Sequence, residues 1–87
     1  MVRLKKAVLA SEVDGEKVLL DAETGVYFGL NETGSRILDF LIEEGVEEAA
    51  LTRFLEEFDA PPERTREDFL LFVSRLREKK LILDEAE

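Results

Sequence analysis

Carboxylates and serine hydroxyls are the side chains of this sequence that could take part in a reaction. The 87 residues include 21 Asp and Glu, and a pair of carboxylates can act as general acid and base. However, the chain has no histidine and no cysteine, so no imidazole can activate its serines and no thiolate can attack a substrate or hold a metal. The paired glutamates stand in polar stretches, where solvation accounts for them. The sequence therefore predicts no enzyme, and no metal or cofactor site.

The charge of the chain is strongly acidic but unevenly spread. Its formal net charge is −9, which opposes binding to the phosphate backbone of nucleic acids. Residues 63–80 nevertheless hold six Lys and Arg against four Asp and Glu. These charges could form solvated pairs within one helix, such as Arg64 with Asp68, or face an anionic partner. The sequence leaves both interpretations open.

The length and hydropathy of the chain limit its organisation. With 45% hydrophobic residues, we expect residues 1–87 to form a single domain with a modest core. No apolar run approaches the roughly 20 residues needed to cross a membrane, and the start of the chain lacks the apolar region of a signal peptide. A cytoplasmic protein is the simplest expectation.

Three strands joined by tight turns are predicted in the first third of the chain. Residues 4–13 alternate loosely, residues 17–21 follow after Asp14-Gly15, and residues 26–30 are rich in aromatic and β-branched side chains. An Asp-Gly pair between two such segments favours a type I′ hairpin. We therefore expect a three-stranded antiparallel meander in chain order, with the third strand at an open edge.

Three helices are predicted in the rest of the chain, at about residues 32–44, 46–58 and 63–80. Asn31 is a good N-cap for the first helix, Gly45 can end it, and the prolines at 61–62 separate the second helix from the third. Residues 81–83 could add a short terminal strand. Strands followed by helices indicate an α+β fold, and three helices with short connections suit a winged helix-turn-helix-like arrangement.

The predicted third strand offers a physical basis for peptide binding. An open edge presents N–H and C=O groups to which an extended peptide can add as a further strand. The candidate residues are Val26, Tyr27, Phe28, Gly29 and Leu30. Gly29 removes a side chain beside the edge, which suits the close approach of another backbone but equally suits a simple bulge before Asn31.

The helix at residues 63–80 supplies a second set of candidates. At about 100° per residue an apolar stripe runs along this helix, and Leu70 extends it into a flank with arginines on each side. Such a flank suits a peptide with apolar anchors and acidic residues, although Leu70 and Leu71 could instead merely widen the core stripe. The residues that we assign to this flank are Arg66, Leu70, Val73, Ser74 and Arg77.

A family resemblance is carried by the run LDAETGVYFGLNETGSRIL at residues 20–38. It resembles the PqqD-like proteins, also called RiPP recognition elements, which serve ribosomally made peptides that are later modified. The pattern LD-x-x-TG-x-Y-x-GLN-x-TG-x-RI is most similar to the small standalone members of lasso-peptide pathways. The resemblance is dense over residues 18–42 and weaker over residues 46–58 and 68–83. Lys80 departs from it, because many relatives have glycine there.

This resemblance implies both a fold and a binding site. In the family, a three-stranded sheet packs on a helical bundle, and the leader peptide of a precursor adds as a strand to the third strand, in a groove shared with the third helix. In this chain that places a leader along residues 26–30. We expect most of the carried-over motif residues to build the turn and the helix cap; they are Thr24, Gly25, Tyr27, Gly29, Leu30, Asn31, Thr33, Gly34 and Ile37.

Leader-peptide recognition without catalysis is the function that the sequence favours. The protein would hold a precursor peptide and present it to a separate modifying enzyme, in a lasso pathway a leader protease. Three alternatives stay open: a peptide chaperone of the same family in pyrroloquinoline quinone biosynthesis, a small winged-helix DNA-binding protein, and a structural subunit. We expect no nucleic-acid and no membrane partner.

Overall fold

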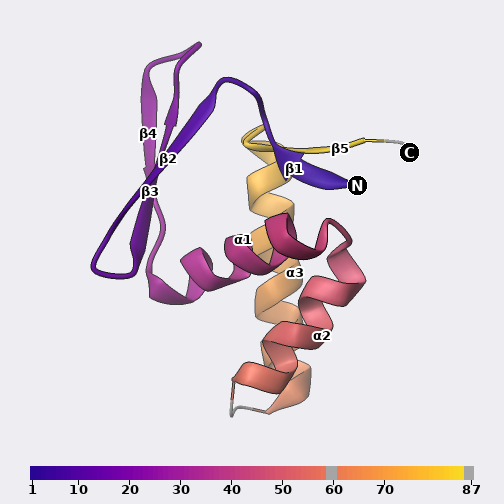
Figure 1. The fold of residues 1–87 in the computed structure, drawn as a ribbon. Helices are drawn as coiled ribbons and strands as arrows, with labels where there is room; N and C mark the ends of the chain where they lie inside the picture. Colours follow the sequence, from indigo (N-terminus) through magenta and orange to yellow (C-terminus); the bar gives the residue numbers. More distant parts are fainter. Residues whose placement is uncertain (59–60, 86–87) are drawn as a thin grey trace.

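The computed structural model describes residues 1–58 and 61–85 (Figure 1). A three-stranded antiparallel sheet has the order β2-β3-β4 and lies beside three helices (Figure 1). The sheet and helices confirm the predicted α+β fold, a meander followed by three helices. The elements are β2 (Val8–Val13), β3 (Glu16–Asp21), β4 (Val26–Gly29), α1 (Glu32–Glu44), α2 (Glu47–Glu57) and α3 (Pro62–Glu78).

The predicted strand over residues 4–13 is wrong in its continuity, because it is two strands that belong to different sheets. β1 (Val2–Leu4) pairs antiparallel with β5 (Ile82–Asp84), close to where we expected a short terminal strand. A turn in which the Val8 N–H donates to the Lys5 carbonyl, at 2.9 Å, separates β1 from β2. The partner of β1 comes from the other end of the chain, and a local alternation pattern carries no information about so distant a pairing.

The tight turns use the residues that the sequence predicts for them. Asp14 and Gly15 both have positive φ, 52° and 80°, as a type I′ hairpin turn requires. The side chain of Asn31 caps α1, because its oxygen accepts the Gly34 N–H at 2.8 Å. Gly45 ends the same helix with a φ of 71°. The entry of the chain from β4 into α1 is therefore fixed by local chemistry.

The second and third helices are close to their predicted bounds. α2 begins one residue later than predicted and ends one residue earlier. Its buried face includes Leu51, which lies beside Ala50 and Phe54. α3 has Pro62 in its first turn, where the missing N–H costs no hydrogen bond. Residues 59–60, part of the predicted helix-ending segment 59–62, lie outside the described residues.

One hydrophobic core joins the sheet, the helices and β5. Leu19 of β3 is fully buried, whereas Val18 and Leu20 on the opposite face of the strand are only half-buried. This alternation is typical of an antiparallel sheet with one face on the core. The buried apolar residues are Val2, Val8, Leu19, Leu30, Ile37, Leu38, Phe40, Leu41, Ala50, Leu51, Phe54, Phe69, Val73, Leu76, Leu81 and Ile82.

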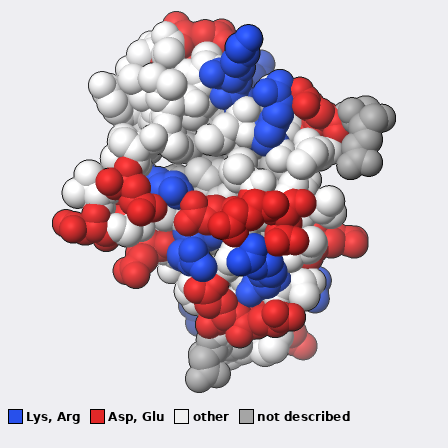
Figure 2. Space-filling view, viewed as in Figure 1, with Lys and Arg blue, Asp and Glu red and all other residues white. Residues whose placement is uncertain are grey.

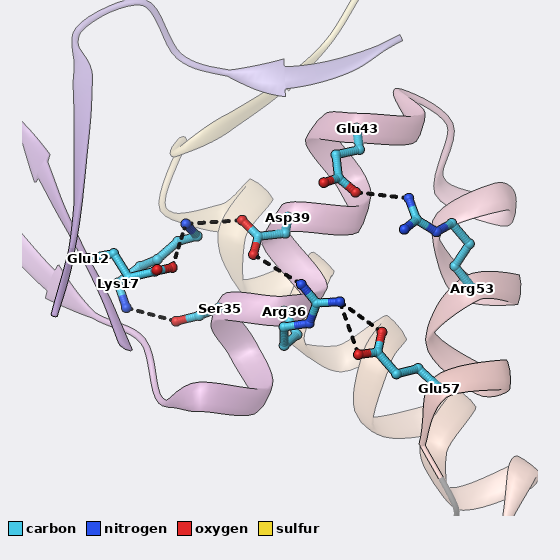
Figure 3. A network of polar contacts seen from close by, with 8 residues as sticks. All are labelled: Glu12, Lys17, Ser35, Arg36, Asp39, Glu43, Arg53 and Glu57. Carbon is cyan, nitrogen blue, oxygen red and sulfur yellow. Dashed lines mark hydrogen bonds and ion pairs between the residues drawn. The ribbon is translucent and has the colours of Figure 1, made fainter. Parts of the chain in front are cut away.

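A chain of ion pairs ties the sheet to α1 and α1 to α2 (Figure 3). Lys17 Nζ lies 3.1 Å from a Glu12 oxygen and 3.0 Å from an Asp39 oxygen. Arg36 continues the chain, 3.6 Å from Asp39 and 2.9 Å from Glu57. The hydrogen bond with Asp39 is the main cause that raises the pKa of Lys17. Figure 2 shows the result at the surface, where acidic and basic side chains lie side by side across the helical half of this face.

Candidate peptide-binding groove

Strand β4 lies at the edge of its sheet and has β3 as its one strand partner. The Leu30 N–H donates to the Lys17 carbonyl at 2.8 Å, so residue 30 directs its backbone groups toward β3. Backbone groups alternate in direction along an antiparallel strand, and Phe28 therefore also points inward while Tyr27 and Gly29 point outward. The free donors and acceptors of this edge are thus the N–H and C=O groups of Tyr27 and Gly29.

Two adjoining cavities follow this edge and separate β4 from α3. One has a volume of about 490 Å³ and lies toward the start of α1. The other, of about 350 Å³, lies toward Tyr27 and Phe28. Four residues line both cavities: Gly29, Leu30, Phe72 and Arg75. The two cavities therefore form one continuous groove, with the strand edge as one wall and α3 as the other.

The α3 wall of the groove is built mainly from residues that the sequence analysis did not select. Leu71 and Phe72 provide its apolar surface, and Arg75, Lys79 and Asp68 provide its charges. Leu71 is 53% exposed, and its exposure leaves apolar surface for a ligand. The Lys79 Nζ lies 5.4 Å from the centre of the Phe28 ring, so a cation–π contact connects the two walls.

Four of the five strand residues that we predicted lie at the groove. Tyr27, Phe28, Gly29 and Leu30 all line it. Val26 belongs to β4 and is 47% exposed, but it lines neither cavity. Contact between these strand residues and a peptide stays a prediction.

The predicted flank of α3 does not line the groove beside β4. Taking about 100° per residue from the buried Phe69, the predicted flank lies on one side of the core stripe and the groove residues lie on the other. Val73 is fully buried, Leu70 and Ser74 are exposed away from the groove, and Arg66 lines neither cavity. Whether the five residues of the predicted flank contact a peptide outside this groove stays a prediction. The helix pattern identifies both flanks of the stripe but not the one that faces β4.

Arg77, the remaining residue of that flank, is held in an ion-pair cluster. Its guanidinium contacts Glu47 at 2.7 Å and Asp84 at 2.7 and 2.9 Å. The hydrogen bond from Arg77 lowers the pKa of Asp84, and the same bond is the main cause that raises the pKa of Arg77. Arg77 therefore connects α3 to α2 and β5.

The motif residues around the groove have mostly structural tasks, as expected. The Thr24 hydroxyl accepts the Val26 N–H at 3.3 Å within the turn before β4. A side chain at Gly34 would bring its Cβ to 2.9 Å from the Phe72 ring, so glycine lets α1 approach α3 closely. Gly29 differs, because an added Cβ would meet nothing within 4 Å. Its lack of a side chain is not required by the packing of the protein itself.

The serine nearest to the groove is also part of the scaffold. Ser35 is buried, and its Oγ accepts the Lys17 N–H at 2.8 Å and donates to the Leu30 carbonyl at 3.4 Å. It thereby satisfies backbone groups where the ladder between β3 and β4 ends.

Across residues 1–58 and 61–85 no group of acidic side chains is placed to hold a metal ion, and no helix there is long and apolar enough to cross a bilayer.

A family comparison agrees with this architecture. The model of the PqqD family, described as coenzyme PQQ synthesis protein D, matches residues 16–82. The chain belongs to the PqqD family. The match runs from the start of β3 to the start of β5, so it includes both walls of the groove. No curated protein matches the chain.

Two solved structures resemble this PqqD-family protein along almost its whole length. One is TbiB1 in complex with the TbiA(beta) leader peptide, with 34% identity, a TM-score of 0.82 and coverage of 98% of this chain and 99% of that chain. The other is a lasso peptide synthetase B1 complexed with the leader peptide, with 24% identity, a TM-score of 0.82 and coverage of 94% and 96%. The second likeness shows the fold alone.

Proposed function

We propose that this PqqD-family protein binds the leader peptide of a ribosomally made precursor, which adds as a strand to the free edge of β4. The observation that carries the proposal is the coincidence of two features. The edge presents the backbone groups of Tyr27 and Gly29, and a groove with apolar lining runs directly along it. The similarity to TbiB1, whose structure contains a leader peptide, supports a ligand of this kind and a lasso-type pathway.

The groove supplies the two contributions that strand addition needs. Main-chain hydrogen bonds to the edge give affinity that is independent of sequence, and pockets for alternate side chains give selectivity. Side chains at positions i and i+2 of a strand point to the same side. A bound peptide can therefore place two apolar side chains into the two adjoining cavities, against Phe72 and Leu76. These contacts must exceed an ordering cost of about 2–5 kcal/mol for a disordered leader.

The protein acts in this proposal as a carrier that holds the precursor for a separate enzyme. The absence of His and Cys and the structural role of Ser35 support this division of labour. In a lasso-type pathway the separate enzyme is a leader protease. The purified protein should leave a bound precursor intact, as judged by mass spectrometry after prolonged incubation. Cleavage or modification by the protein alone would contradict the carrier role.

The proposal is tested with proline variants of the two strand edges. Fluorescence anisotropy would measure binding of labelled peptides, namely the TbiA(beta) leader and candidate leaders of other lasso-type precursors. Tyr27→Pro and Gly29→Pro each remove an outward N–H, and each should weaken binding at least tenfold. Ala10→Pro is the matched control, because residue 10 points outward on the opposite edge at β2.

Circular dichroism would verify that the three proline variants keep the secondary structure of the wild type. The proposal is contradicted if Ala10→Pro weakens binding while the two β4 variants bind normally. It also fails if none of the leaders binds to the wild-type protein.

The family match favours a second candidate function, a peptide chaperone in coenzyme PQQ synthesis. That function would use the same groove and the same strand addition. The two candidates differ in the precursor that binds, so a competition between a PQQ precursor peptide and a lasso leader for the wild-type protein separates them.

A further inference from the structure

Six of the twelve Lys and Arg form ion pairs within the described residues, and the basic residues of the groove belong to the other six. Arg36, Arg53 and Arg77 each contact a carboxylate within 3 Å. Arg75 and Lys79 make no ion pair within the described part of the chain, although the sequence holds 21 acidic residues. Both are exposed, and both line the groove. Two free positive charges therefore lie beside the strand edge of a protein whose net charge is −9.

The groove also has an acidic residue, and it lies at the other end. Asp68 lines the first cavity together with Leu30, whereas Lys79 lines the second together with Tyr27 and Phe28. Arg75 lines both cavities and so lies between them. Asp68 has no ion-pair partner among residues 1–58 and 61–85. Along the groove, the charge changes from negative near the end of β4 to positive near its start.

We propose that this charge gradient selects the order of charges in the bound peptide. The inference rests on the proposed strand addition at β4. Every strand pair within the described residues is antiparallel, and antiparallel ladders are slightly more stable than parallel ones. A peptide added in this direction has its N-terminal part near Asp68 and its C-terminal part near Arg75 and Lys79. The preferred ligand carries basic or uncharged residues first and acidic residues later.

Three synthetic peptides of equal length, with blocked ends, test this order. All share one alternating apolar segment that fills the two cavities. The first has two lysines before the segment and two glutamates after it, the second has these charges exchanged, and the third has glutamine at all four positions. The first should bind about three- to tenfold more tightly than the second at low salt, with the neutral peptide between them. Added salt should bring the three dissociation constants together.

Charge reversal in the protein identifies the residues responsible. Arg75→Glu should reduce or abolish the preference for the first peptide, and Asp68→Lys combined with Arg75→Glu should favour the second peptide. Lys6→Glu is the matched control, because it changes the net charge equally at an exposed position that lines neither cavity. It should leave the order of the three affinities unchanged.

The outcomes separate this inference from the proposed function. If none of the three peptides binds, strand addition at β4 is contradicted. If all bind with equal affinity, or if Lys6→Glu has the effect expected for Arg75→Glu, the charge gradient has no role and the proposed function stands. If the second peptide binds most tightly to the wild type, the inferred charge order is wrong.

Discussion

At the scale of single residues, the protein uses several polar side chains to hold its backbone in place. Asn31 caps α1, Ser35 closes the end of the ladder between β3 and β4, and Thr24 supports the turn before β4. Each of them lies next to the segment that forms one wall of the groove. These polar side chains thus serve the backbone geometry that the strand edge requires.

The cap at Asn31 should contribute measurably to stability. Asn31→Ala leaves the Gly34 N–H without its side-chain acceptor and should lower the free energy of unfolding by about 1 kcal/mol. Asn31→Asp keeps an acceptor at the same place and should retain most of the stability. Urea unfolding of the three proteins measures both effects. Equal loss in the two variants would show that the side-chain hydrogen bond is not the source of the effect.

The ion pair between Arg77 and Asp84 should make stability depend on pH. Because the folded protein lowers the pKa of Asp84, this carboxylate stabilises the fold above its unfolded pKa of about 3.9, and the contribution is lost as the pH falls toward and through the folded value. Asp84→Asn should therefore lose less stability than the wild type between pH 6 and pH 3 in urea unfolding.

Glu56→Gln is the control for that experiment, since Glu56 is exposed and makes no ion pair within residues 1–58 and 61–85. Its acid sensitivity should equal that of the wild type. An Asp84→Asn variant with wild-type acid sensitivity would contradict a role of this pair in stability.

At the scale of elements, the sheet is fixed to the helices through one face. Leu19 is fully buried on that face, whereas Leu9 of the neighbouring strand is 59% exposed on the other. Leu19→Ala should cost about 2–5 kcal/mol, because it removes buried methyl groups and leaves a cavity. Leu9→Ala makes the same chemical change and should cost less than about 1 kcal/mol. Thermal unfolding compares the two, and similar losses would contradict the assigned faces.

Local signals in the sequence predicted the elements well, and they failed where the structure depends on distant contacts. Asp14-Gly15, Asn31 and Gly45 act within a few residues, and each has the predicted conformation. The pairing of β1 with β5 joins the two ends of the chain, and no local pattern indicates it. The flank of α3 that faces β4 was missed for the same reason. The helix repeat shows two flanks beside the core stripe, and only packing against β4 decides which of them lines the groove.

At the scale of the whole molecule, the groove is a joint product of elements distant in sequence. β4 contributes an edge whose outward backbone groups follow from the pairing with β3, and α3 contributes apolar and charged side chains from about forty residues later. The core packs both elements against the rest of the protein, and the ion pairs from Glu12 to Glu57 join the sheet to α1 and α1 to α2. The packed core therefore holds the β4 edge beside α3.

Hydrogen exchange of backbone amides, followed by NMR with and without a bound leader peptide, tests the central claim most directly. The account predicts that leader slows exchange at the outward-facing amides of Tyr27 and Gly29. The amides of Ala10 and Glu12, which face outward on the opposite edge at β2, should exchange as before. Protection of the β2 edge or of α2, with Tyr27 and Gly29 unchanged, would contradict strand addition at β4.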